Sequence, residues 1–316
     1  MEEKNLSDKC KILIISPGEH FLRNILPLFF NNQIDFIISG VVSRTKRHLE
    51  NMPEVSIYRN LSEVDVSAFD CIYSSSPNCF HAEEVMYAIR NEKHILVEKP
   101  ICTISNILES KLILSAKTVV QEGLMYQYHH QFQAIKNFLK KDNDLGLLRK
   151  INIQFLIPHL NEDNIRYSTN LDGGAFNDMA VYPLTFCSEI MKSFDLIHAN
   201  SERKGYDVDV EGCLILANAS CEATIQYGFG FAYKNIAEIV FENGFMTIAR
   251  PFSKPSEFSH PIRIYKNMEH VQSLKYACCN HFQLMFEAFY KRINSNVNND
   301  QIKSRVDQIT KIAKLL

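Results

Sequence analysis

The chain has 316 residues, of which 46% are hydrophobic, and a formal net charge of −2. This length accommodates two domains with separate cores, and the ordinary hydrophobic content indicates a soluble globular protein. The interspersed acids and bases argue against nucleic acid or an anionic membrane as a partner. The polar N-terminus has no secretory h-region, and no apolar run is long enough to span a bilayer, so we expect a cytoplasmic protein.

The nine cysteines do not follow a metal-binding or disulfide pattern. There is no C-x-x-C pair, and Cys278 and Cys279 are adjacent, which is poor geometry for a tetrahedral site. Cys71, Cys187 and Cys213 lie in apolar segments, where a free thiol packs as a small hydrophobic group. We therefore expect structural cysteines and no metal.

The first expected strand, residues 11–16, turns directly into an amphipathic helix, as in a dinucleotide-binding unit. In a G-x-G-x-x-G frame, Ser16 and Phe21 replace two glycines, and only Gly18 remains. The helix N-terminus can still bind an anion through its free N–H groups, and Ser16 adds a hydroxyl. We expect this turn, including Glu19, to contact a cofactor.

The second expected strand, residues 36–43, ends in the basic segment 43–47, SRTKR. An NAD-specific site would place a carboxylate here to hold the ribose 2′-hydroxyl. A hydroxyl at Ser43 and a cation at Arg44 suit a 2′-phosphate instead, which predicts a preference for NADP(H), with NAD(H) as the alternative. A solvated basic turn is the non-functional interpretation.

The segment 94–100, HILVEKP, follows the strand 71–76, a turn at Pro77 and Asn78, and a helix over residues 81–91. Its apolar start is typical of a strand buried on both faces of a parallel sheet. Ligands bind at the carboxyl ends of such strands. A lysine there, held near a glutamate, can hydrogen-bond a substrate oxygen and supply a proton, which makes Glu98 and Lys99 candidates. The alternative is that both residues begin a solvated loop.

The pattern changes after the last expected parallel strand, residues 118–123. A long helix to about Asp142 precedes four β-rich runs, at residues 147–158, 212–231, 235–250 and 261–276. These runs predict an antiparallel sheet of five or six strands, with a hairpin at Asn243-Gly244 and helices on one face. Two helices should end the chain and pack on the body. We expect an α/β doubly wound Rossmann domain over residues 1–123 and an α+β domain with a large, mostly antiparallel open sheet over residues 124–316.

A second candidate cluster follows the pair Gly173-Gly174. These glycines permit positive φ or a close backbone approach. Asp178 and Tyr182 follow at a spacing of four residues, which places both on one helix face. A carboxylate and a phenol there could form a proton relay with a lysine. The alternative is a helix-terminal carboxylate and a half-buried structural tyrosine.

Six segments in order resemble the glucose–fructose oxidoreductase, inositol dehydrogenase and rhizopine catabolism family. They are PNCFH (77–81), HILVEKP (94–100), EGLMYQYHHQF (122–132), the LG of DLGLLRKI, IRYSTNLDGGAFNDMAVYP (165–183) and FENGFMTIARPF (241–252). The match is similar to the branch with tyrosine in the second motif. That branch includes NADP-dependent 3-ketoreductases of nucleotide-linked deoxysugars, glucose–fructose oxidoreductase and dimeric dihydrodiol dehydrogenases. Gln127 and His130 stand where relatives often have arginine and proline.

The resemblance implies a Rossmann domain followed by an open sheet that also forms a homodimer or homotetramer interface. It implies that Lys99 is the general acid or substrate-orienting cation, that Tyr182 is catalytic, and that Asp178 hydrogen-bonds the substrate. The implied residues on the nicotinamide side are Ser76, Pro77, Asn78, His81 and Glu98, with Arg166 also contacting the cofactor.

These inferences predict reversible hydride transfer between NADP(H) and a sugar or cyclic polyol carbon, with Lys99 or Tyr182 as the proton donor. The leading substrate expectation is a nucleotide-linked 3-ketosugar. A free aldose, cyclic polyol or dihydrodiol is the enzymatic alternative. A non-catalytic NADP-binding regulator is the alternative from another class, because two fingerprint glycines are missing.

Overall fold

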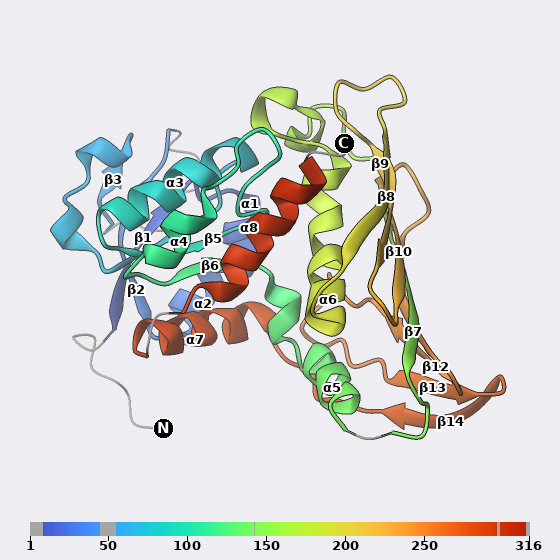
Figure 1. The fold of residues 1–316 in the computed structure, drawn as a ribbon. Helices are drawn as coiled ribbons and strands as arrows, with labels where there is room; N and C mark the ends of the chain where they lie inside the picture. The colour runs from blue at the N-terminus through green and yellow to red at the C-terminus, as the bar shows by residue number, and fades with distance from the viewer. Residues whose placement is uncertain (1–8, 45–54, 142, 296–297, 314–316) are drawn as a thin grey trace. The chain divides into compact units, whose positions relative to one another are not determined.

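The computed structural model describes residues 9–44, 55–141, 143–295 and 298–313. The chain forms two compact units (Figure 1). One contains the chain up to Leu124 together with Phe282–Thr310, and the other is built from Met125–His281. The C-terminal helices α7 (His281–Ile293) and α8 (Asp300–Ala313) thus belong largely to the first unit, whereas the sequence pattern had grouped them with the second. No helix within the described ranges combines the length and apolarity needed to cross a bilayer.

The first unit contains a six-stranded sheet in which every neighbouring pair is parallel. Its strands are β1 (Cys10–Ile15), β2 (Phe36–Val42), β3 (Ile57–Tyr58), β4 (Cys71–Ser74), β5 (His94–Val97) and β6 (Val120–Glu122). Their order is β3-β2-β1-β4-β5-β6, so the chain winds outward in both directions from β1 and β4. This order confirms the predicted doubly wound α/β fold.

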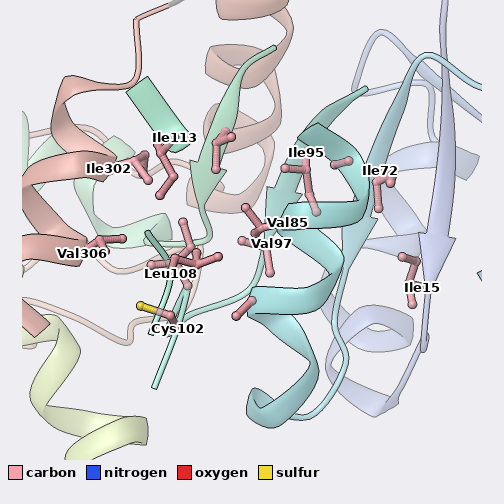
Figure 2. Close-up of a cluster of buried hydrophobic side chains, with 14 of the residues drawn as sticks. Ile15, Ile72, Val85, Ile95, Val97, Cys102, Leu108, Ile113, Ile302 and Val306 are labelled. Atoms are coloured by element: carbon pink, nitrogen blue, oxygen red, sulfur yellow. The ribbon is translucent and has the colours of Figure 1, made fainter. Parts of the chain in front are cut away.

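Besides α7 and α8, the first unit contains the helices α1 (Glu19–Asn24), α2 (Leu26–Phe30), α3 (Asn78–Arg90) and α4 (Ser110–Ser115). Helices α3, α4 and α8 pack on the sheet through one apolar cluster (Figure 2). Ile302 and Val306 of α8 join the cluster that contains Ile113, Leu108 and Val97. Burial of these side chains explains why α8 groups with the first sheet.

The second unit contains an eight-stranded sheet, in the order β14-β13-β12-β11-β7-β10-β9-β8. Its strands are β7 (Leu148–Ile157), β8 (Asp195–Glu202), β9 (Glu211–Ala217), β10 (Glu222–Phe229), β11 (Lys234–Phe241), β12 (Phe245–Ala249), β13 (Ile262–Lys266) and β14 (Glu269–Leu274). Only the β7–β10 pair is parallel, which confirms the mostly antiparallel prediction. The expected five or six strands were too few, because β8 is a largely exposed strand with little apolar pattern.

The helices of the second unit, α5 (His130–Leu139) and α6 (Val181–Met191), lie on the same face of this sheet (Figure 1). The expected long helix is present as α5, but it begins only at His130 and ends at Leu139. A 3₁₀ turn at Met125–Tyr128 comes first, and His129 caps α5 by accepting the Gln131 N–H at its Nδ1 across 3.0 Å. The Asn243-Gly244 hairpin is confirmed between β11 and β12, where Phe241 N donates to Gly244 O across 2.8 Å.

Candidate active site

Glu98 and Lys99 leave the carboxyl end of β5, at the edge where a doubly wound sheet binds its ligand. The Tyr73 hydroxyl donates to Glu98 Oε1 across 2.9 Å, and His20 Nε2 lies 3.6 Å from the same oxygen. Burial alone would raise the pKa of Glu98, but His20, the Tyr73 hydroxyl and Lys99 outweigh burial and lower it. A carboxylate beside Lys99 is therefore kept ionised in a buried position.

The turn after β1 places Ser16, Gly18 and Glu19 at the same edge of the sheet. Ser16 has a φ of 50°, and its carbonyl accepts the Ser75 hydroxyl across 2.9 Å. Gly18 is the N-cap of α1, and a Cβ built there would meet no atom within 4 Å. The backbone at Gly18 is thus open to close approach by a phosphate, as the single remaining glycine of the fingerprint predicts. Glu19 is exposed in the first helical turn.

Arg44, just after the end of β2, lies next to the aromatic ring of Phe80. Ser43 N donates to Tyr58 O across 2.9 Å, which fixes the backbone immediately before Arg44. The exposed Arg44 guanidinium lies 5.4 Å from the centroid of the Phe80 ring. A planar, permanently charged donor at this strand end fits the predicted 2′-phosphate contact. Lys46 and Arg47 of the same basic segment lie outside the described residues.

The connection from β4 to α3 is held by His81. Its Nδ1 lies 2.7 Å from Pro100 O and its Nε2 lies 2.8 Å from Ser76 O. Burial lowers the pKa of His81, although both carbonyls favour a protonated ring. Pro77 is the N-cap of α3 and Asn78 is its first residue. His81 thus ties the loop after β4 to the loop that carries Lys99.

The buried carboxylate of Glu84 also supports the loop after β4. Glu84 accepts hydrogen bonds from the hydroxyls of Ser74 and Ser76, the latter across 2.6 Å. Burial raises the pKa of Glu84 to about 7, against the opposing effect of the two hydroxyls. Glu84 is therefore part of the scaffold that holds the expected cofactor loop.

In the second unit, the glycine pair forms a turn that fits only glycine. A Cβ on Gly173 would lie 2.5 Å from Arg166 O, and one on Gly174 would lie 2.2 Å from Asp209 Oδ1. Gly174 also has a φ of +100°. Asp209 accepts the Phe176 N–H across 2.7 Å, so its carboxylate closes the turn from a distant loop.

The turn leads into Asp178, which Arg166 binds. Arg166 Nε donates to Asp178 Oδ2 across 2.7 Å, and the Asp178 side chain is only 13% exposed. The Asp178 charge raises the pKa of Arg166. Asp178 lies in a π-helical turn, Phe176–Ala180, rather than in the expected regular helix. Such turns are frequent at functional sites.

Tyr182 follows in α6 and is surrounded by aromatic rings. The ring centroids of Phe155, Phe252 and Tyr126 lie 5.6, 5.8 and 6.1 Å from its own. Its side chain is 8% exposed, so packing restricts its orientation. Arg166, Asp178 and Tyr182 belong to the second unit and the other predicted residues to the first, so the pairing of Lys99 with Tyr182 remains a prediction.

Several residues in or near these clusters were not predicted from the sequence. Tyr73 lies in an apolar strand, whose pattern predicts a structural core residue. His20 belongs to a turn in which the glycine pattern was the signal considered. Asp209 follows Gly174 by 35 residues and carries no local signal. Glu122 ends a parallel strand, and the same rule that identified Glu98 could have identified it.

Residues 13–128 match the sequence model of the GFO_IDH_MocA family, described as an oxidoreductase family with an NAD-binding Rossmann fold. Among characterised relatives, a dTDP-3,4-didehydro-2,6-dideoxy-alpha-D-glucose 3-reductase of Saccharopolyspora spinosa is 29% identical over 200 residues, 62% of this chain and 60% of the relative. The enzyme of the same name from Actinomadura kijaniata is 26% identical over 83% of this chain and 80% of the relative. The chain thus spans about three fifths of the first relative's length.

Two solved structures extend the likeness of the fold to nearly the whole chain. KijD10, a 3-ketoreductase from Actinomadura kijaniata solved with NADP and TDP-benzene, has a TM-score of 0.85 at 20% identity and covers 97% of this chain and 96% of its own. The aldose-aldose oxidoreductase of Caulobacter crescentus has a TM-score of 0.78 at 17% identity and covers 97% of this chain and 98% of its own. At these identities the likeness establishes the fold.

Proposed function

We propose that this chain, whose residues 13–128 match the sequence model of an oxidoreductase family with an NAD-binding Rossmann fold, is an NADPH-dependent ketosugar reductase. The observation that carries the proposal is the setting of Glu98 and Lys99 at the carboxyl end of β5. The Glu98 carboxyl, whose pKa is lowered by His20, by the Tyr73 hydroxyl and by the charge of Lys99, lies with Lys99 at the edge where such a sheet binds its ligand.

The residues at this edge fit a dinucleotide with a 2′-phosphate. Gly18 leaves open space for a pyrophosphate, and Arg44 supplies a cation at the end of β2 where an NAD-specific site would have a carboxylate. When bound, the cofactor supplies a hydride. The structural neighbour KijD10 was solved with NADP, which favours the same choice here.

The chain's own residues would bind the ketone, orient it and deliver a proton. Lys99 donates a proton to the carbonyl oxygen as negative charge develops there, with the Glu98 carboxylate next to it in the chain. Tyr182 is the second candidate donor, fixed by its aromatic surroundings, and Asp178 accepts a hydrogen bond from a sugar hydroxyl. The structural neighbour KijD10 has been solved with NADP in forms altered at a single lysine and at a single tyrosine. This supports the choice of Lys99 and Tyr182 as the candidate proton donors in this chain.

A nucleotide-linked 3-ketosugar is the substrate class that the relatives favour, since the two quoted above are named as 3-reductases of a dTDP-deoxysugar. A free sugar or cyclic polyol is the second candidate, supported by a scyllo-inositol 2-dehydrogenase of Bacillus subtilis that is 26% identical over 69% of this chain. A site built around a nucleotide diphosphate should discriminate strongly against a free sugar.

The test follows NADPH consumption by the purified protein with a dTDP-3-keto-deoxysugar or scyllo-inosose, and NADPH formation from NADP⁺ with glucose or a trans-dihydrodiol. We expect turnover of the nucleotide sugar, and Lys99→Met should lower it by about 10²- to 10⁴-fold if Lys99 is the general acid. Tyr182→Phe is the matched variant that separates the two donors. Turnover of Lys99→Met equal to that of the wild type would assign the proton to another group.

We also propose a homodimer or homotetramer that forms through the second sheet. The face of this sheet opposite α5 and α6 carries an alternating polar set that is accessible in the single chain, namely Asn152, Gln154, Gln226, Glu238 and Arg263, with Ile236 exposed among them. Light scattering after gel filtration would test this assignment. Ile236→Glu should shift the mass to that of a single chain, and an unaltered oligomer would place the interface elsewhere.

A further inference from the structure

The short segment that carries Lys99 is anchored at several backbone positions. Glu98 N donates to Ser74 O across 2.9 Å, and Pro100 O lies 2.7 Å from His81 Nδ1. One residue further on, Ile101 N donates to Glu122 Oε1 across 2.9 Å. Glu122 therefore contributes a carboxylate anchor two residues beyond Lys99.

Glu122 is paired with a residue from the far end of the chain. Arg305 of α8 places its Nε 3.5 Å from Glu122 Oε2, with side chains 6% and 2% exposed. Arg305 Nε and Nη1 and Glu122 Oε2 make no hydrogen bond with the described residues. A buried ion pair with incomplete hydrogen bonding contributes little to the stability of the fold, because an apolar pair of similar volume often gives equal or greater stability.

Glu122 and Lys99 also interact electrostatically. Burial raises the pKa of the Glu122 carboxyl, while Arg305, the Ile101 N–H and the nearby Lys99 oppose that rise. Arg305 thus partly offsets the effect of burial on the pKa of Glu122, which remains raised. The hydrogen bond from the Ile101 N–H is the geometric part of this arrangement.

We propose that Glu122 is a positioning residue for Lys99, and that Arg305 of the C-terminal helix holds the Glu122 carboxylate in place for this task. The inference rests on the proposed function, in which Lys99 donates a proton. Small displacements of a catalytic group are costly, on the order of 10²-fold for about 1 Å. Docking of α8 would then be a condition for activity.

The experiment compares Glu122→Leu, which removes the anchor, with Glu122→Gln, which keeps an oxygen that can accept the Ile101 N–H. The double variant Glu122→Leu/Arg305→Leu replaces the pair by apolar side chains and preserves folding should the single variant fail to fold. Lys303→Ala removes a cation from the same helix at a more exposed position and is the control. For each we would measure kcat, the NADPH dissociation constant, and the rate at which trinitrobenzenesulfonate modifies Lys99, followed by peptide mass spectrometry.

We expect both leucine variants to lose about 10- to 100-fold in kcat with an NADPH dissociation constant changed by less than about twofold, while Glu122→Gln and Lys303→Ala retain most activity. The rate of Lys99 modification should change most in the two leucine variants, which remove the anchor, and should keep its wild-type value in Lys303→Ala. Wild-type kcat and wild-type Lys99 modification in a folded leucine variant would overturn the proposal. Should the wild-type protein reduce none of the substrates, the proposed function fails, and the modification rates, which need no turnover, still decide the role of Glu122.

Discussion

Arg166 Nε lies 2.7 Å from Asp178 Oδ2, so the carboxylate expected to bind substrate is already held by a cation. We predict that Arg166→Gln and Asp178→Asn each destabilise the fold by about 1–3 kcal/mol, because either change leaves a charged partner without its counter-charge. The double variant should lose less stability than the sum of the losses in the two single variants. A double-mutant cycle of urea unfolding measures this coupling, and additivity within about 0.5 kcal/mol would show that the pair is energetically unimportant.

Gly174 should be the least replaceable glycine of the second unit. Its φ of +100° strains any other residue, and a Cβ would collide with Asp209 Oδ1. Gly205 has a similar φ of +89° but no atom within 4 Å of a built Cβ, so it is a matched control. We expect Gly205→Ala to lower the free energy of unfolding by about 1 kcal/mol, because of backbone strain alone. Gly174→Ala should lower it by clearly more, because the collision with Asp209 is added to the strain. Equal losses in urea unfolding would mean that Asp209 moves away without cost.

Glu84 should make the fold less stable as the pH rises. Burial raises its pKa from 4.5 to about 7, so between these values the folded state binds a proton that the unfolded state releases. Stability is therefore lost as pH rises through this window. Glu84→Gln cannot ionise, and from pH 5 to pH 8 the wild type should lose about 2 to 3 kcal/mol relative to the variant. Urea midpoints at both pH values measure this change, and a difference that is independent of pH would contradict it.

Arg44 should decide the choice between the two nicotinamide cofactors. Removing a cation from a 2′-phosphate costs a charge-assisted contact, so Arg44→Ala should weaken NADPH binding about tenfold. NADH lacks the phosphate, and its affinity should change little. Arg23→Ala, which removes a cation from the last turn of α1, is the control. An equal effect of Arg44→Ala on both cofactors would place Arg44 elsewhere than at the 2′-phosphate.

The sequence predicted a doubly wound parallel sheet in the first unit because most of its strands are apolar runs that end in polar residues. The position of Glu98 and Lys99 at such an end followed from the same pattern. By contrast, the break at His129 depends on a ring nitrogen that caps α5, and an apolar helical pattern does not reveal it. Strand β8 was missed because exposed side chains along Asp195–Glu202 leave almost no burial pattern to detect.

Partners that are distant in the sequence could not be predicted. Asp209 closes the turn at Gly174, and Arg305 reaches Glu122 across more than half of the chain. Asp209 has no local motif, and the position of Glu122 at a strand end does not identify Arg305 as its partner, because each contact exists only once the tertiary fold brings the segments together. The grouping of α7 and α8 with the first sheet has the same cause. Their amphipathic pattern predicts burial of one face without saying against which sheet.

In the proposed function, this chain binds NADPH at the edge formed by Gly18, Arg44 and Glu98. Titration of the purified protein with NADPH and with NADH, followed by nicotinamide fluorescence, tests this binding. We expect saturable NADPH binding at least about tenfold tighter than NADH binding, because NADPH makes one additional charge-assisted phosphate contact. Absence of binding by either cofactor would contradict it, because the loss of two fingerprint glycines would then have disabled the site on which the proposed reaction depends.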